Sequence, residues 1–120
     1  MNFKQNIPIY LQIADRIMDE ILTGVYSVNG RIPSVREYSV ALEVNVNTMV
    51  KVYDHLTSSG LIYIKRGLGY FVSESAPAQI RQMRKTQFFT DFLPQLAEKM
   101  QQLGITEEDL KKELTKYLNK

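Results

Sequence analysis

The fold is decided by residues 34–72, which read SVREYSVALEVNVNTMVKVYDHLTSSGLIYIKRGLGYFV. The stretch opens with Ser34 and, three residues later, Glu37, a pair typical of the capping box at a helix N-terminus. The short apolar stripe that follows ends near Leu42, because Asn45 offers the next helix cap. The sequence therefore predicts a short helix that is followed almost at once by another.

The second of these helices is predicted over residues 46–59 and ends at Gly60. Its apolar side chains recur at positions i, i+3, i+4 and i+7, which defines a single buried face. The residues of that face are Met49, Val52, Tyr53 and Leu56. Polar side chains fall on the opposite face, and they are Asn47, Lys51 and Asp54. We expect this polar face to be exposed.

A β-hairpin is predicted directly after Gly60. Residues 61–64 and 69–72 are short runs rich in β-branched and aromatic side chains. Between them lies the segment Lys65-Arg66-Gly67-Leu68. This order of runs indicates two strands joined by a basic tip.

A first helix is predicted upstream of the deciding stretch. Asn6 is suited to be its N-cap, and Pro8 to its first turn, where a missing N–H costs nothing. Apolar residues at helical spacing run from Ile9 to Leu22, and Gly24 ends them. A helix, a short helix, a longer helix and a basic-tipped hairpin are the plan of a winged helix-turn-helix. The expected fold class is therefore mainly α with a small β-hairpin.

The chain changes character at residues 73–77, a small, polar segment that ends in proline. We expect a winged domain over residues 1–75 and a helical dimerisation region of two helices over residues 76–120. Its first helix is predicted over residues 78–103, with a kink at Pro94. The apolar stripe of this region is the expected dimer interface, with the residues Phe88, Phe89, Phe92, Leu96, Met100, Leu114 and Leu118.

Composition excludes several classes of function. The 120 residues contain no cysteine and a single histidine, His55, so thiolate sites and histidine-rich metal sites are ruled out. No nucleophile stands beside a base, so we expect neither an enzyme nor a cofactor. No long apolar run suggests a signal peptide or a membrane span, which makes the cytoplasm the expected location.

The net charge of +2 says little about partners, because residues 1–75 carry equal numbers of basic and acidic side chains. An argument for nucleic acid must rest on where the charges lie. A helix about 12 Å across fits a major groove of about that width, and a hairpin tip beside it reaches the backbone or minor groove. The candidate DNA-binding residues are Arg36, Asn45, Asn47, Thr48, Lys51, Lys65, Arg66 and Gly67.

Arg36 is the sharpest of these signals. It falls in the first turn of a helix, where the helix dipole disfavours a cation, and a local cost of this kind indicates a use. The alternative is an arginine that is only solvated beside Glu37. Lys65 and Arg66 have the same two interpretations: a soluble hairpin tip, or a wing whose glycine Gly67 lets backbone N–H groups approach phosphates.

The chain also contains an ordered set of motifs that resembles a known family. They are Pro8-Ile9-Tyr10-Leu11-Gln12-Ile13, Gly30-Arg31-Ile32-Pro33-Ser34-Val35-Arg36-Glu37, Val44-Asn45-Val46-Asn47-Thr48, Gly60-Leu61-Ile62 and Arg66-Gly67-Leu68-Gly69-Tyr70-Phe71-Val72. Through them, residues 7–73 resemble the DNA-binding domain of GntR-family transcription regulators. The short C-terminal part resembles the YtrA-type branch, which implies a homodimer built by the C-terminal helices, without a large effector domain.

By this resemblance, Arg36, the start of the third helix and Arg66-Gly67 occupy the DNA-contact positions of the family. Val46 and Val50 depart from it, because many relatives carry arginine or other polar residues there; the two valines either touch thymine methyl groups or pack. Glu43 stands where the family usually has glycine. A left-handed backbone there would cost a glutamate about 1 kcal/mol.

The sequence thus indicates a homodimeric regulator, a repressor that binds a palindromic, double-stranded DNA operator. The resemblance does not decide whether a small-molecule effector binds. The alternative is a winged-helix adaptor that binds proteins through its wing and C-terminal aromatic residues; Asn47, Thr48 and Lys51 argue against it.

Overall fold

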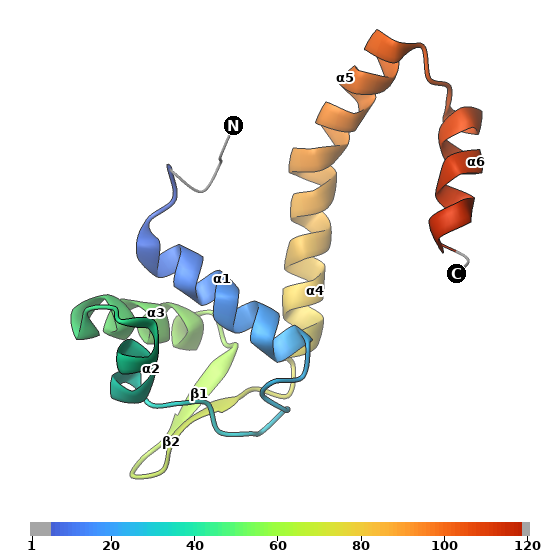
Figure 1. The fold of residues 1–120 in the computed structure, drawn as a ribbon. Coiled ribbons are helices and arrows are strands. Elements are labelled where there is room, and N and C mark those ends of the chain that lie inside the picture. Colours follow the sequence, from blue (N-terminus) through green and yellow to red (C-terminus); the bar gives the residue numbers. More distant parts are fainter. Residues whose placement is uncertain (1–5, 119–120) are drawn as a thin grey trace. The chain divides into compact units, whose positions relative to one another are not determined.

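A computed structural model of the chain describes residues 6–118, which fall into two compact units, Met1–Gln82 and Met83–Lys120 (Figure 1). The helices of the first unit are α1 (Ile9–Leu22), α2 (Val35–Leu42) and α3 (Val46–Ser58). Strands β1 (Ile62–Lys65) and β2 (Gly69–Val72) follow. Helix α4 (Ala76–Gln87) crosses the division, and α5 (Leu93–Leu103) and α6 (Glu107–Leu118) belong to the second unit. The mainly helical winged fold expected from the sequence is confirmed.

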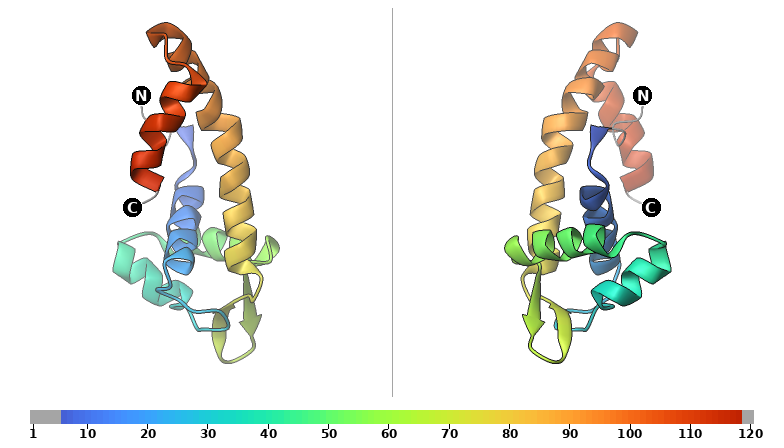
Figure 2. Two further views of the ribbon diagram at one scale, coloured as in Figure 1. Left: turned by 90° about the vertical axis from the view of Figure 1, so that its right-hand side faces the viewer. Right: turned by 90° about the vertical axis from the view of Figure 1, so that its left-hand side faces the viewer.

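The core of the first unit forms where α1, α2 and the hairpin pack on α3. The apolar face predicted for α3 is fully buried, because Met49, Val52, Tyr53 and Leu56 each have an exposed fraction of 0%. Figure 2 shows α2 and the hairpin below α3 and toward its two ends. Helix α3 therefore has one face fixed by the core and the opposite face open.

The expected boundary at residues 73–77 lies inside the packing of the first unit. Ala76 and Ile80, in the first turns of α4, are fully buried in the same core cluster as α3. The contacts divide the chain after Gln82. A chain that ended at residue 75 would lose both of these core side chains.

The hairpin is extended by the segment that leads into α2. Strands β1 and β2 pair antiparallel, with Ile62 opposite Val72 and Lys65 opposite Gly69. Residues 29–32 run along the free edge of β2: the N–H of Ile32 donates to the carbonyl of Tyr70 at 3.0 Å, and an isolated bridge joins Arg31 to Phe71. The wing is therefore anchored to the chain just before α2.

Local side chains start the helices largely as the sequence predicts. Ser34 and Glu37 form the reciprocal capping box, and the Asn45 side chain accepts a hydrogen bond from the N–H of Asn47 at 2.7 Å. The exception is α1, where Pro8 occupies the cap position and makes no side-chain cap bond. The prediction that Asn6 is the N-cap was therefore wrong, because α1 begins at Ile9, directly after Pro8.

In the second unit, the interruption expected at Pro94 takes the form of a π-helical segment, Phe88–Phe92. The N–H of Leu93 donates to the carbonyl of Phe88, five residues back. Pro94 falls in the first turn of α5, where its missing N–H is tolerated. Because of this π-helical turn, α4 continues into α5 without an intervening loop.

Helices α5 and α6 form a hairpin of their own. Gly104 has a left-handed φ of 68° and ends α5. Thr106 and Asp109 exchange two hydrogen bonds of 3.1 Å, a capping arrangement at the start of α6. Those bonds lower the pKa of the Asp109 carboxyl, so its charge remains at the positive end of the helix dipole.

The turn between α2 and α3 contains the left-handed backbone that the family pattern suggests. Glu43 has φ 54° and ψ 47°, a conformation in which a Cβ atom is strained. We predict that Glu43→Gly stabilises the first unit by up to about 1 kcal/mol, the relief of strain less the greater entropy of glycine in the unfolded chain.

The matched control is Glu43→Ala, which removes the carboxylate and keeps the Cβ atom. Urea denaturation of the three proteins gives the free energies of unfolding. Equal stability of the glycine and alanine variants would show that the left-handed turn carries no strain.

Candidate nucleic-acid interface

The exposed face of α3 presents the polar residues that the sequence assigned to DNA. Asn47 and Lys51 are exposed on it, together with Asp54. Thr48 is half-buried at the border of this face, and Asn45 uses its side-chain oxygen to cap the helix. A capped helix start with free amide and ammonium groups has the geometry that reads base edges in a major groove.

Arg36 lies in the first turn of α2, the helix that precedes α3. Its side chain is exposed, while its carbonyl accepts a hydrogen bond from the Ser39 hydroxyl at 3.0 Å. Among residues 6–118 the guanidinium has no ion-pair partner, and the neighbouring Glu37 pairs with Arg31 instead. The structure therefore leaves Arg36 available for a partner.

The two cations of the wing are not equivalent. Lys65 points to the side of the hairpin away from the core, where its ammonium group lies 4.9 Å from the centre of the Phe71 ring. Arg66 is exposed at the tip, and Gly67 beside it has a left-handed φ of 80°. Because strand residues alternate between faces, Tyr70 points the other way, toward α3. The tip proper is thus Arg66 and Gly67.

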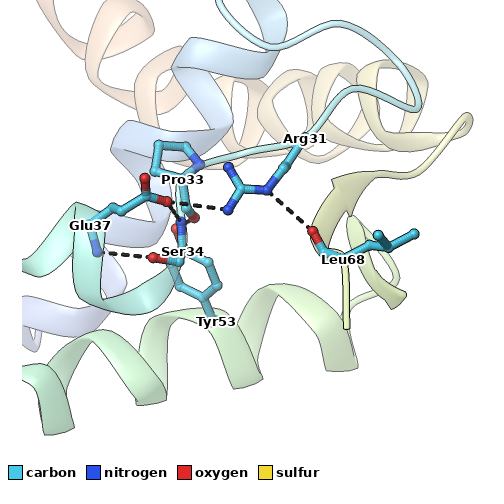
Figure 3. A network of polar contacts seen from close by, with 6 residues as sticks. All are labelled: Arg31, Pro33, Ser34, Glu37, Tyr53 and Leu68. Carbon is cyan, nitrogen blue, oxygen red and sulfur yellow. Dashed lines mark hydrogen bonds and ion pairs between the residues drawn. The ribbon is translucent and has the colours of Figure 1, made fainter. Parts of the chain in front are cut away.

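Arg31 joins the wing to the start of α2, a role that the sequence reasoning missed (Figure 3). Its Nε donates to the carbonyl of Leu68 at 3.2 Å, and its Nη2 lies 3.3 Å from Glu37 Oε1. Gly69 lies against this side chain, since a Cβ atom there would be only 3.1 Å from Nε. Arg31 belongs to the family-like motif Gly30-Arg31-Ile32-Pro33-Ser34, and this was the only sequence signal for its role. The contact with residue 68 could not be predicted, because it arises only when the chain folds.

Glu37 is held ionised in this network. The backbone N–H of Ser34 donates to its Oε1 at 2.8 Å, and this bond, the Ser34 hydroxyl and Arg31 together lower the pKa of the carboxyl. One carboxylate therefore caps α2 and anchors Arg31 at the same time. The wing and the helix that carries Arg36 share a single anchor.

Tyr53 fixes α3 against the same two elements. Its hydroxyl donates to the carbonyl of Pro33 (Figure 3). Its ring packs edge-on against Tyr70, with 4.9 Å between the ring centres. Burial raises the pKa of this hydroxyl, which stays a neutral donor. Helix α3 is thereby set relative to α2 and the wing.

Other chemistry finds little support in the described part of the chain. Within residues 6–118, no three acidic, histidine or cysteine side chains gather as a metal site would require. None of the helices described here is both long and apolar enough to cross a membrane. A helix with an open polar face, flanked by a cationic helix start and a cationic wing, defines a winged-helix DNA-binding protein.

The comparisons with known proteins identify the family. Residues 9–72 match the family described as bacterial regulatory proteins, gntR family. YhcF of Bacillus subtilis, an uncharacterised HTH-type transcriptional regulator, is 32% identical over 90% of this chain and 88% of its own. YtrA of the same organism, an HTH-type transcriptional repressor, is 32% identical over 69% of this chain and 64% of its own.

Solved structures agree with these relatives. A putative GntR-family regulator from Bacteroides thetaiotaomicron is 43% identical, with a TM-score of 0.79 over 93% of this chain and 97% of that one. AraR(DBD) in complex with operator ORR3 is 32% identical, with a TM-score of 0.52 over 55% of this chain and 80% of that one. The chain belongs to the GntR family; it is a transcription regulator with a DNA-binding domain and not an enzyme.

The anchor made by Arg31 predicts an indirect effect on DNA binding. Arg31→Ala removes the hydrogen bond to the Leu68 carbonyl and the ion pair with Glu37, while the capping bond between Glu37 and Ser34 remains. The wing therefore loses its fixed position relative to α2. We expect affinity for a selected operator duplex to fall about fivefold, equivalent to about 1 kcal/mol. Arg81→Ala, which removes an exposed arginine of α4, is the matched control for charge.

The double variant Arg31→Ala/Arg66→Ala distinguishes a role of Arg31 in anchoring the wing from a direct contact of Arg31 with DNA. If Arg31 acts through the wing, the Arg66→Ala change costs less in the Arg31→Ala background than in the wild type. Strictly additive losses would mean that Arg31 touches DNA itself or acts elsewhere.

Proposed function

We propose that the protein is a sequence-specific operator-binding regulator that represses transcription as a homodimer. The observation that carries the proposal is the open polar face of α3, flanked by Arg36 and Arg66, in a domain similar to one crystallised on its operator. Relatives named as repressors, YtrA and NagR, support the sign of regulation. A regulator of this kind shares a compartment with the chromosome, and on that ground we assign it to the cytoplasm.

Each candidate residue has a defined task in this proposal. Asn47 pairs with the edge of adenine, and Lys51 and Thr48 contact a base or phosphate on either side. Asn45 acts by starting α3. Arg36 contacts phosphate or guanine, while Arg66 and Gly67 bring the wing tip to the backbone or minor groove. Lys65, which lies over the Phe71 ring, adds charge more than a specific contact.

The dimer is proposed to form through the second unit. Its aromatic side chains are half exposed, at 50% for Phe88, 52% for Phe89 and 49% for Phe92. An apolar groove runs between α5 and α6, and its lining includes Leu96, Met100, Leu114 and Leu118. An exposed apolar surface of this kind is typical of a protein–protein interface. A closed twofold dimer buries it and matches the symmetry of a palindromic operator.

We assign this groove to the second copy and leave an effector ligand out of the proposal. Sites for small ligands combine apolar walls with a few convergent polar groups. The polar residues of this groove, such as Glu107 and Lys111, alternate with the leucines of α6 on adjacent helix positions, as they do along the rim of a helix pair. The lining therefore suits another apolar helix face.

DNA binding is tested by selecting duplexes from a random library with the full-length protein and then measuring affinity against salt. We expect a preferred sequence and a steep loss of affinity with rising salt, because Arg36, Lys51 and Arg66 displace counterions from phosphates. Arg36→Ala is expected to weaken binding by about 1–3 kcal/mol. Binding that ignores both sequence and salt would refute the proposal and favour the adaptor.

The dimer is tested by sedimentation of the wild type and of Leu114→Glu, which places a charge in the groove. We expect a wild-type dimer at micromolar concentration and a monomeric variant that binds single half-sites as before. Its preference for the full palindrome falls by about 10²–10⁴, because the second contact is no longer intramolecular. Lys112→Glu, on α6 but outside the groove lining, is the control. A monomeric wild type would contradict the dimer.

A further inference from the structure

Two valines interrupt the polar surface of α3. Val46 and Val50 have exposed fractions of 42% and 41%, although the helix buries its other valine, Val52, completely. They are four residues apart and therefore neighbours on the helix surface. Neither residue belongs to the core cluster or to the hydrophobic side chains packed against it. Their methyl groups form an apolar strip about one helical turn long.

The contacts of α3 tell which side of the helix carries this strip. At about 100° per residue, Val46 and Val50 come between Tyr53 and Asn47 around the helix. Tyr53 faces the start of α2 and the wing, through Pro33 and Tyr70. The strip therefore lies next to the side of α3 that faces the start of α2 and strand β2 of the wing.

The opposite flank of α3 belongs to α1. His55, which lies on that flank, packs edge-on against Tyr10 of α1 at 6.0 Å between ring centres. The valines therefore lie on the flank of α3 that is turned away from α1. They lie between the proposed base-reading residue Asn47 and the proposed wing contact.

An apolar strip in this position needs an apolar group on its partner. The edges of base pairs in the major groove carry hydrogen-bond donors and acceptors, with one apolar exception, the C5-methyl group of thymine. Branched valine side chains have few rotamers, so they present their methyl groups in a fixed place. The chemistry of the strip therefore fits thymine and no other base.

We propose that Val46 and Val50 read thymine methyl groups in each half-site of the operator. This inference rests on the proposed function and adds to it the class of base that α3 selects. Asn47 beside the strip reads adenine, the partner of thymine, so the three residues together favour A·T pairs under the start of α3.

The test removes single methyl groups from the DNA. The full-length protein first selects its preferred duplex from a random library, and each thymine of that duplex is then replaced by deoxyuridine, one at a time. We expect the wild type to lose about fourfold in affinity at one or two thymines of each half-site, the effect of uncovering one methyl group.

Protein variants locate the methyl groups. Val46→Ala and Val50→Ala keep or raise helix propensity, so both are expected to fold. Each should bind the thymine operator more weakly and should no longer distinguish thymine from deoxyuridine at its own position. The control is Val28→Ala, a loop valine whose exposed fraction is likewise 42%, which should retain full affinity and full discrimination.

The possible results separate this inference from the proposed function. A preferred duplex whose affinity no deoxyuridine changes overturns the role of the valines and leaves operator binding intact. Deoxyuridine penalties that persist unchanged in both alanine variants overturn that role as well. A selection that returns no preferred sequence overturns the operator-binding function, and the inference with it.

Discussion

The position of the proposed DNA-binding surface depends on the burial of one side chain, Tyr53. Its ring is enclosed in the core and packs on Tyr70 of the wing, and its hydroxyl donates to the carbonyl of Pro33 just before α2. A buried hydroxyl without a partner is costly, so this bond favours a single arrangement of three elements that are separate in the sequence. Arg31 repeats the connection at the surface, between Glu37 and the wing. Together they hold the exposed face of α3, Arg36 and the wing tip in one rigid frame.

The sequence predicted those features whose causes are local. The capping box of Ser34 and Glu37 and the apolar stripe of α3 depend on residues within a few positions of each other. The left-handed turn at Glu43 was suggested by the family pattern alone. The features it missed depend on long-range contacts: the edge pairing of residues 29–32 with β2, the Arg31 anchor, and Ala76 and Ile80 in the core of the first unit. The DNA-binding residues were predicted by pattern and family likeness, and their contacts stay a prediction, because such contacts form only with the partner.

The two units divide the work by the kind of surface they expose. The first packs one apolar core and presents cations and amides, together with the valine strip, on the exposed part of α3 and on the wing tip. The second leaves leucines and phenylalanines half exposed along α5, α6 and the π-helical segment. Polar, cationic surface suits DNA, and continuous apolar surface suits another copy of the chain. In the proposed function, base reading and the pairing of half-sites therefore belong to different parts of the 120-residue chain.

The central claim is that the exposed face of α3, with the wing tip, is the surface that meets DNA. The most direct measurement is an NMR titration of the full-length, isotope-labelled protein with its selected operator duplex. The account predicts that the amide resonances of residues 46–51 and 65–67 shift together as the duplex is added, while the Tyr53 amide, inside the core, shifts little. Large shifts confined to α1 or to the second unit, with residues 46–51 unchanged, would contradict it.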